Sequence, residues 1–309
     1  MQGRFVRRHA ASSWAVDTSA TTDGAEGMSD HRFRQVAQLV QQAVGIQLPP
    51  AKRVMVEGRL RKRAQSLGYQ GVDPYCAALF DEGLLEAEYQ ELVNLITTNK
   101  TDFFREAEHF ELLRSTLVPN LLAGHGHPQG GPRLKVWSAA CSIGAEAYTI
   151  AMVLDDMTRA TRPPFRFAVL GTDIATHVLE HAERAIYPAA MLDPVPGELR
   201  LRYTLRSRDP TQPLLRIVPE LRRHVRFAQL NLMNARYPCD RDVDIIFCRN
   251  VLIYFDRPTQ VAIVSRLAGH LRPGGYLILG HSETAAASGA VGLLPVASTV
   301  WRRSEDEAA

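Results

Sequence analysis

Cysteine, net charge and long apolar runs are all scarce in this sequence, and each scarcity excludes a class of protein. The four cysteines, Cys76, Cys141, Cys239 and Cys248, show no CxxC or other metal-ligand spacing, which argues against a disulfide framework and a metal site. A formal net charge of +3 is too small to predict nucleic-acid binding. No apolar run approaches the roughly 18 residues of a membrane span, and no signal-peptide core follows the N-terminal arginines. We therefore expect a cytoplasmic protein with reduced thiols, no metal and no direct membrane insertion.

Two domains are expected in a chain of 309 residues of which 46% are hydrophobic, because such a chain can bury a sizeable core. Residues 1–28 are polar and lack an apolar period, which predicts a disordered leader. Apolar residues at helical spacing from Phe33, and helix signals near residues 50–67, 73–83 and 86–97, predict a small all-helical domain over residues 29–110. A linker is expected over residues 111–132.

The remaining chain, residues 133–305, alternates apolar strand segments with helical ones. This pattern predicts an α/β domain with a parallel sheet covered on both faces. The expected strands are Leu134–Ser138, Arg166–Thr172, Asp244–Cys248 and Gly275–Gly280. Short periods broken by prolines, with strand-like pieces at residues 202–205 and 214–218, predict a small β subdomain over about residues 187–229.

The segment from Asp242 to Glu283 carries the strongest local signal. Its apolar run, residues 243–247, ends abruptly on Cys248-Arg249-Asn250, as a central parallel strand does when it delivers polar groups at its carboxyl end. Ligands of open α/β sheets bind at that end. The segment therefore predicts a ligand site, although each single residue would also fit an ordinary loop.

The sequence VWSAACSIGAEAYTIAM, residues 136–152, reads as a strand, a turn of small residues and a helix. Such a turn lets a ligand approach the backbone, and close packing of strand on helix is the alternative. It is not GxGxxG, so a dinucleotide, and with it a dehydrogenase, is disfavoured. At the end of the next strand, Asp173 could accept hydrogen bonds from ribose hydroxyls or cap a helix. Glu146 could complement a helix dipole or receive a cationic ligand.

The segment TTNKTDFFREAEHF, residues 97–110, interleaves Asn99, Thr101 and Arg105 with two adjacent aromatic residues. Adjacent aromatics usually belong to a core, but this segment could also close a pocket over a charged substrate. Arg105 would suit a carboxylate, because a planar guanidinium can bind one bidentately.

A basic helix begins near residue 52 and places Lys52, Arg59 and Arg63 on one face. A solvated charged face is one interpretation of this pattern. A docking surface for an acidic partner is the other, since such a surface steers encounter.

Six motifs follow one another in order and at compatible spacing between residues 30 and 303. They are Asn99-x-Thr101-x-Phe103-Phe104-Arg105-Glu106, WSAACS-x-G-x-E (residues 137–146), Thr172-Asp173-Ile174, Leu230-Asn231-Leu232, IFCRNVLIYFD (residues 246–256) and PGGYLILGHSE (residues 273–283). Together they resemble the chemotaxis receptor glutamate methyltransferases, the CheR family. The resemblance implies an α/β, Rossmann-like methyltransferase sheet with a small antiparallel β subdomain, preceded by a small all-α domain.

The resemblance also implies a reaction and a site. Members of this family transfer the methyl group of S-adenosylmethionine to glutamates on the cytoplasmic helices of methyl-accepting chemotaxis receptors, leaving S-adenosylhomocysteine. Carried over by motif, the implied cofactor contacts are Asn99, Thr101, Arg105, Glu146, Asp173, Asn231, Leu232, Asn250 and Val251. Arg105 and Tyr254 would lie near the methyl group and the incoming carboxylate. The face of Lys52, Arg59 and Arg63 would dock on acidic receptor helices.

Two departures from the family pattern bear on function. The turn at residues 142–148 reads S-I-G-A-E-A-Y where the family usually has S-T-G-E-E-P-Y, which is the support for an alternative, a non-catalytic module that senses the cofactor or binds a receptor. The loop Arg206–Pro213 contains no glycine, unlike the loop of members that tether themselves to a C-terminal receptor pentapeptide. Pentapeptide tethering is therefore not expected.

Overall fold

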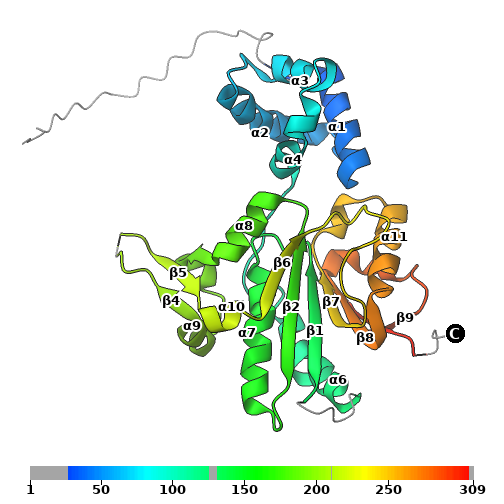
Figure 1. Ribbon diagram of the computed structural model, residues 1–309. Helices are drawn as coiled ribbons and strands as arrows, with labels where there is room; N and C mark the ends of the chain where they lie inside the picture. Colours follow the sequence, from blue (N-terminus) through cyan, green and yellow to red (C-terminus); the bar gives the residue numbers. More distant parts are fainter. Residues whose placement is uncertain (1–26, 125–130, 210, 306–309) are drawn as a thin grey trace, which may run out of the picture.

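The computed structural model describes residues 27–124, 131–209 and 211–305, and it shows a group of N-terminal helices next to a larger α/β unit (Figure 1). Residues 1–26 of the predicted leader lie outside the described residues. Within the described part of the chain, no helix is both long and apolar enough to cross a membrane.

The N-terminal helices form a small bundle with its own core. They are α1 (Asp30–Val44), η1 (Pro50–Lys52), α2 (Arg53–Ser66), α3 (Val72–Asp81) and α4 (Leu85–Ile96). The side chain of Ser29 caps α1 by accepting a hydrogen bond from the Arg32 amide, and Gly45, with a left-handed φ of 73°, ends it. Buried residues at helical spacing, such as Val36, Val56 and Leu92, meet in the core. This all-helical region confirms the predicted fold class of the first part of the chain.

The larger unit is built on a seven-stranded sheet with the order β6-β2-β1-β7-β8-β10-β9. Its strands are β1 (Arg133–Ala139), β2 (Arg166–Asp173), β6 (Val225–Gln229), β7 (Val243–Cys248), β8 (Leu271–Leu279), β9 (Leu293–Ala297) and β10 (Val300–Arg303). The first five of these strands run parallel, and β10 runs antiparallel to β8 and β9. The four strands predicted from the sequence are therefore present, and the β9–β10 hairpin adds an edge that the sequence patterns did not predict.

The two faces of this sheet bury different residues because alternate side chains point in opposite directions. One face, with Val136, Ile245 and Phe247, packs against the helices before and after β1. The opposite face, with Trp137 and Ile246, packs against α11.

The helices of this unit are α5 (Glu108–Leu112), the π-helical η2 (Leu113–Leu117), α6 (Val118–Gly124), α7 (Ala145–Ala160), α8 (Thr176–Arg184), η3 (Ala189–Leu192), α9 (Gly197–Tyr203), α10 (Pro219–Arg222), η4 (Leu252–Tyr254), α11 (Arg257–Ala268), η5 (His281–Glu283) and α12 (Thr284–Ala287).

A second, three-stranded antiparallel sheet lies on the side of α8 and α9 (Figure 1). It consists of β3 (Ile186–Pro188), β4 (Thr204–Arg206) and β5 (Leu214–Ile217), in the order β3-β5-β4. The range predicted for this subdomain, residues 187–229, extends too far, because Val225–Gln229 forms β6 of the large sheet, parallel to β2. The main-chain groups at the edge of β2 are paired by β6, a long-range contact that local periodicity does not reveal.

Candidate functional site

A pocket that is partly open to solvent lies at the carboxyl ends of β1, β2 and β7. Val44 and Ile46 of the helical bundle also line it. Every residue that the sequence analysis placed at the cofactor or at the reacting groups contributes to its wall, namely Asn99, Thr101, Arg105, Glu146, Asp173, Asn231, Leu232, Asn250, Val251 and Tyr254. These residues come from five separate segments, which the parallel sheet brings to one edge.

The backbone around this pocket is unusual. Left-handed φ angles at residues other than glycine occur at Phe104, Glu106, Ala140, Ser142 and Asn250, all of them in pocket-forming segments. Such conformations cost free energy and persist where the surrounding structure enforces them, often at functional sites. At Gly144, whose φ is 84°, an added Cβ would lie 2.8 Å from Cβ of Ala182. Close packing therefore explains why residue 144 is glycine. Ala140 and Ser142, by contrast, line the pocket itself.

Asp173 ends β2 and is only 7% exposed. One of its carboxylate oxygens accepts a hydrogen bond from the Ser142 amide at 2.8 Å, and the other accepts one from the Ala175 amide at 3.0 Å. Burial raises the pKa of Asp173, and these backbone donors oppose the rise. The carboxylate thus fixes the small-residue turn after β1 while it lines the pocket. Asp173 is not the N-cap of α8, which is Ala175.

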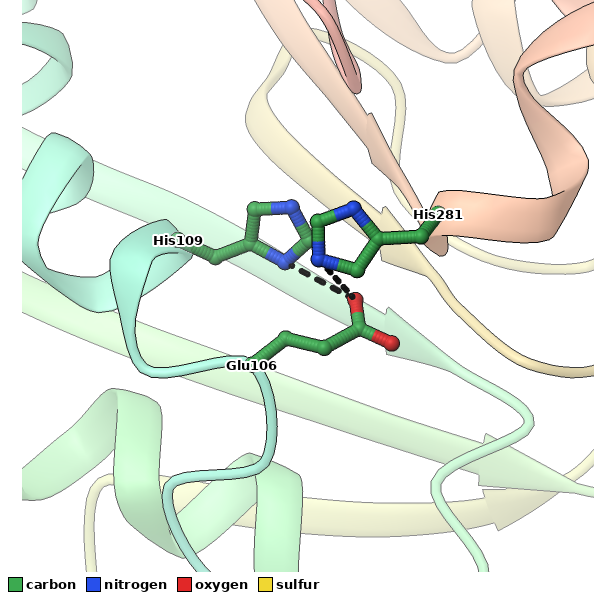
Figure 2. A group of neighbouring side chains, drawn as sticks. All are labelled: Glu106, His109 and His281. Atoms are coloured by element: carbon green, nitrogen blue, oxygen red, sulfur yellow. Dashed lines mark ion pairs between the residues drawn. The ribbon is translucent and has the colours of Figure 1, made fainter.

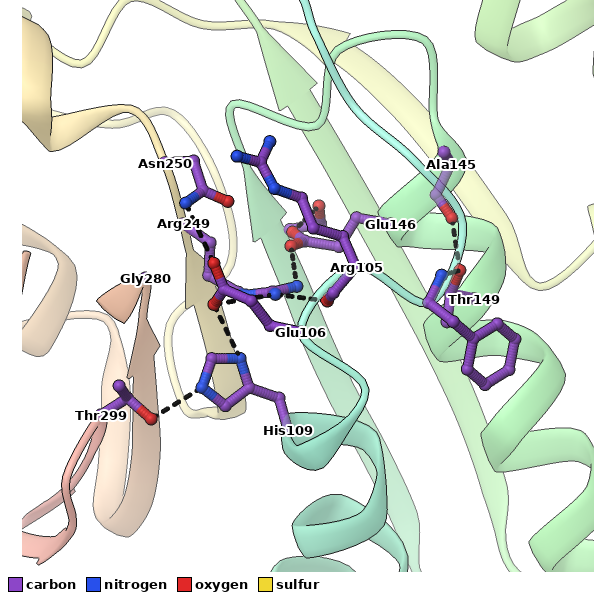
Figure 3. A network of polar contacts seen from close by, with 12 residues as sticks. Arg105, Glu106, His109, Ala145, Glu146, Thr149, Arg249, Asn250, Gly280 and Thr299 are labelled. Carbon is purple, nitrogen blue, oxygen red and sulfur yellow. Dashed lines mark hydrogen bonds and ion pairs between the residues drawn. The ribbon is translucent and has the colours of Figure 1, made fainter. Parts of the chain in front are cut away.

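A buried ion-pair network lies beneath the pocket and is centred on Arg249 (Figure 3). The Arg249 side chain is 2% exposed and lies 2.9 Å from a carboxylate oxygen of Glu146 and 3.1 Å from one of Glu106. It also donates to the main-chain carbonyl of Arg105 at 2.5 Å. The second oxygen of Glu146 accepts a hydrogen bond from the Ser138 hydroxyl at 2.7 Å. The network therefore connects the segment before α5 with α7 and with the end of β7.

Glu283 organises the loop that follows β7. Its side chain is buried and accepts hydrogen bonds from the amides of Asn250 at 2.7 Å, Leu252 at 2.6 Å and Gly280 at 3.0 Å. At Gly280 an added Cβ would lie 2.7 Å from Oε2 of Glu283, so only glycine admits the carboxylate here. Sequence reasoning did not identify Glu283, Glu106 or Arg249 as site residues, although all three stand within the quoted motifs.

The segment from Asn99 to Arg105 closes one side of the pocket. The Ser142 hydroxyl donates to the main-chain carbonyl of Asn99 at 2.8 Å. Phe103 is fully buried, with its ring edge-on to Tyr187 at 5.0 Å between centroids, so it belongs to the core. The Arg105 guanidinium lies in the pocket wall, where Nη1 donates to the Lys100 carbonyl at 3.2 Å. Figure 3 shows it extending away from the buried network.

Two further predicted residues connect the pocket to the helical bundle. The Asn231 side-chain amide donates to the carbonyl of Ala43 at 2.7 Å, and its oxygen accepts from the Met233 amide at 2.9 Å. The carbonyl of Tyr254 accepts a hydrogen bond from the Gln47 amide at 3.1 Å, and Nζ of Lys52 lies 5.2 Å from the centroid of its ring. The bundle therefore forms part of the pocket.

The three basic residues predicted to dock a partner have different surroundings. Lys52 is half-buried beside Tyr254. Nη1 of Arg59 donates to the carbonyls of residues 95, 96 and 97 at the end of α4, at 2.8–3.1 Å. Arg63 binds the buried carboxylate of Glu88 through two hydrogen bonds of 2.8 and 2.6 Å. Arg59 and Arg63 thus hold α2 against α4, and docking by their face stays a prediction.

The ion pair of Arg63 and Glu88 should make the stability of the helical bundle depend on pH. The hydrogen bonds from Arg63 hold the pKa of Glu88 below its usual value. Replacing Glu88 by glutamine should destabilise the bundle by about 1–3 kcal/mol near neutral pH. A carboxylate whose pKa is lower in the folded protein stabilises the fold at pH values above its unfolded-state pKa of about 4.3. This stabilisation is lost as the pH falls through the folded-state pKa. The difference between the two proteins should therefore shrink in acid.

Hydrogen exchange in α2 and α4, measured at pH 7 and in acid, reports this difference for the bundle alone. Glu86→Gln, at an exposed position on α4, is the matched control and should exchange like the wild type. Equal protection in Glu88→Gln and the wild type at pH 7 would contradict the expectation.

Comparison with known proteins matches both parts of the chain to one family. Residues 31–97 match the profile described as CheR methyltransferase, all-alpha domain. Residues 99–293 match the one described as CheR methyltransferase, SAM binding domain. The chain belongs to the CheR methyltransferase family. The resemblance derived from the six motifs and the predicted Rossmann-like methyltransferase fold are both confirmed.

Individual CheR relatives cover most of this chain. It is 42% identical over 256 residues to a chemotaxis protein methyltransferase of Escherichia coli K12, covering 83% of this chain and 85% of that protein. It is 39% identical to chemotaxis protein methyltransferase 2 of Pseudomonas aeruginosa, covering 81% and 85%. A solved geranyl diphosphate methyltransferase aligns with a TM-score of 0.36 and 15% identity over 62% of this chain and 61% of that chain, and this likeness adds nothing to the CheR assignment.

Proposed function

We propose that this chain transfers the methyl group of S-adenosylmethionine to glutamate side chains of chemoreceptors, forming glutamate methyl esters and S-adenosylhomocysteine. The observation that carries the proposal is the single pocket that gathers the family's motif residues from five segments. Such an enzyme is a protein-glutamate O-methyltransferase. Its place would be the cytoplasm, where it would adapt chemotaxis signalling.

The residues present fit S-adenosylmethionine. The ligand has a ribose diol, a flat adenine and an amino-acid end with an ammonium and a carboxylate, and it supplies a methyl group activated by a cationic sulfonium. Asp173 offers a buried carboxylate for hydroxyl donors, as strand-end acids do in related folds. Ile174, Leu232 and Val251 provide apolar wall, and the carboxylate of Glu146, which pairs with Arg249, also lines the pocket and could accept a hydrogen bond from an ammonium group.

The chain's own part in the reaction is to position and desolvate the accepting group. An ionised glutamate is a nucleophile without proton removal, so a general base is unnecessary, and correct placement lowers the barrier. Arg105, at the pocket wall, can bind that carboxylate through its planar guanidinium and orient it. Tyr254 and the helical bundle narrow the entrance and keep water out.

The partner in this proposal is a cytoplasmic helix of a methyl-accepting chemotaxis receptor. A groove runs beside Tyr254 between η4 and the start of the bundle, with Arg34, Lys52 and Ile253 among its lining residues. Basic and apolar side chains on one surface suit an amphipathic helix that carries acidic residues. Pentapeptide tethering stays unexpected, because the loop Arg206–Pro213 contains no glycine.

The test is a transfer assay with S-adenosylmethionine labelled in its methyl group and purified receptor cytoplasmic fragments. We expect label on the receptor that alkali releases as methanol, because methyl esters hydrolyse in base, and none when the fragment is omitted. Cofactor binding by calorimetry without any base-labile label, on every receptor fragment of the source organism, would support the non-catalytic alternative instead.

A further inference from the structure

Three side chains with metal-ligand chemistry meet beside the pocket, outside the residues assigned to the reaction. Glu106 and His109 flank the start of α5, and His281 is the first residue of η5 after β8. One ligand atom from each lies within 4.8 Å of the other two. Figure 2 shows both imidazole rings directing a nitrogen toward the same Glu106 oxygen.

The polar contacts inside this cluster are incomplete. His109 is 2% exposed, and its Nε2 lies 2.7 Å from the Thr299 hydroxyl. Its Nδ1 is buried without a hydrogen-bond partner and faces Oε2 of Glu106 at 3.4 Å. That oxygen also lies 3.1 Å from Nη2 of Arg249. With the ring proton on Nε2 toward Thr299, the Nδ1 lone pair points toward this carboxylate oxygen, and both atoms can bind a cation placed between them.

Neighbouring groups hold these ligand atoms in place. The Asn250 amide donates to the other oxygen of Glu106 at 3.1 Å, which directs Oε2 toward the two histidines. Thr299 orients His109 in the same way through Nε2. Metal-binding imidazoles and carboxylates are usually oriented by such hydrogen bonds from their outer atoms.

The local charge also suits a divalent cation. Two carboxylates, of Glu106 and Glu146, pair with one guanidinium, of Arg249, which leaves a formal charge of −1, and a third carboxylate, of Glu108, lies beside His281. The two terminal nitrogens of Arg249 are engaged with Glu146, Glu106 and the Arg105 carbonyl.

We propose that Glu106, His109 and His281 form a binding site for a divalent transition-metal cation such as Zn²⁺. Two imidazole nitrogens and one carboxylate oxygen favour Zn²⁺ over Mg²⁺ or Ca²⁺, which prefer all-oxygen ligand sets. Bonds of about 2.1 Å place tetrahedral ligand atoms roughly 3.4 Å apart. The Glu106 oxygen lies 3.4 Å from Nδ1 of His109 and 3.8 Å from Nε2 of His281, which is close to this separation.

The exposure of His281 gives the cation a route from solvent. Its side chain is 53% exposed, and its Nε2 lies 2.5 Å from a carboxylate oxygen of Glu108, which can act as a fourth ligand. The bound cation cross-links the segment before α5 to the end of β8. It thereby fixes Glu106, the partner of Asn250 at the pocket. The sequence analysis predicted no metal because it considered only ligand spacing along the chain, and these ligands come from distant motifs.

The test is calorimetric titration of the full chain with Zn²⁺, comparing the wild type with His281→Ala. We expect one bound equivalent in the wild type at this site and at least a tenfold loss of its affinity in the variant, which should fold because the side chain is exposed. His31→Ala, at an exposed position on α1, is the matched control and should bind like the wild type. His9, His125 and His127 lie outside the described residues, so the assignment depends on the difference between the variants.

A second variant tests the buried side of the site without removing a ligand. Thr299→Val keeps the shape of the side chain but loses the hydrogen bond to His109, and the loss of such a partner weakens metal binding about 10- to 100-fold. The visible absorption of bound Co²⁺ should report tetrahedral coordination in the wild type and weaken in Thr299→Val. No Zn²⁺ binding by the wild type, or unchanged affinity in both variants, would overturn the proposal.

Discussion

Replacing Arg249 by methionine should lower the free energy of unfolding of the α/β domain by about 3–5 kcal/mol. The guanidinium is 2% exposed and pairs with the carboxylates of Glu146 and Glu106. Methionine fills much of the same volume but leaves both carboxylates, which are only 12–15% exposed, without their cation. Urea unfolding followed by tryptophan fluorescence measures the loss, because Trp137 and Trp301 are buried in this sheet.

Arg184→Met is the matched control for this experiment. Arg184 pairs with Glu180 at 3.6 Å, but both side chains are 68% exposed, so the loss should stay below about 1 kcal/mol. The deficit of Arg249→Met should also shrink as the pH falls, because protonation removes the unpaired carboxylate charges. Equal stability of the two arginine variants would show that the buried network contributes little.

Substituting Arg105 by alanine should reduce kcat/KM for receptor methylation about 100-fold while leaving the protein folded. The expectation rests on the proposed function, in which Arg105 orients the accepting carboxylate, and misplacement of a reacting group by about 1 Å costs that much. In the structure the guanidinium makes one hydrogen bond, to the Lys100 carbonyl, so its removal should cost little stability. Initial rates with labelled cofactor and a receptor fragment measure the effect.

Arg105→Lys separates charge from geometry in the same assay. Lysine keeps the positive charge but cannot bind a carboxylate bidentately, so this variant should recover only part of the lost rate. Wild-type kcat/KM in Arg105→Ala would remove Arg105 from the site. A large loss of unfolding free energy in Arg105→Ala would instead indicate a structural role.

Local patterns were sufficient to predict the four central strands of the large sheet and the pocket at their carboxyl ends. A fully buried strand such as β7 is an uninterrupted apolar run, and strands that alternate with helices must be parallel, so their carboxyl ends meet at one edge. Asp173 and Asn250 could therefore be placed near each other although they come from different motifs. The six motifs added Asn99 and Arg105, which no periodicity connects to the sheet.

Contacts between distant segments could not be predicted in this way. The basic face of α2 has the same sequence whether it is solvated, docks a partner or binds its own bundle, and the structure directs Arg63 to Glu88 and Arg59 to the end of α4. Strand β6 could not be predicted from local patterns either, because its five residues form a strand by pairing with β2.

The sequence by itself determined the fold class, the family and ten of the residues that line the pocket, because these follow from local periodicity and from motifs that are each contiguous. Only the tertiary structure decided which charges are paired beneath that pocket. Arg249, Glu146 and Glu106 come from three elements, and the cluster of Glu106, His109 and His281 joins two distant ones. The energy of a buried charge depends on the groups within a few ångströms of it, and the folded backbone alone sets those neighbours.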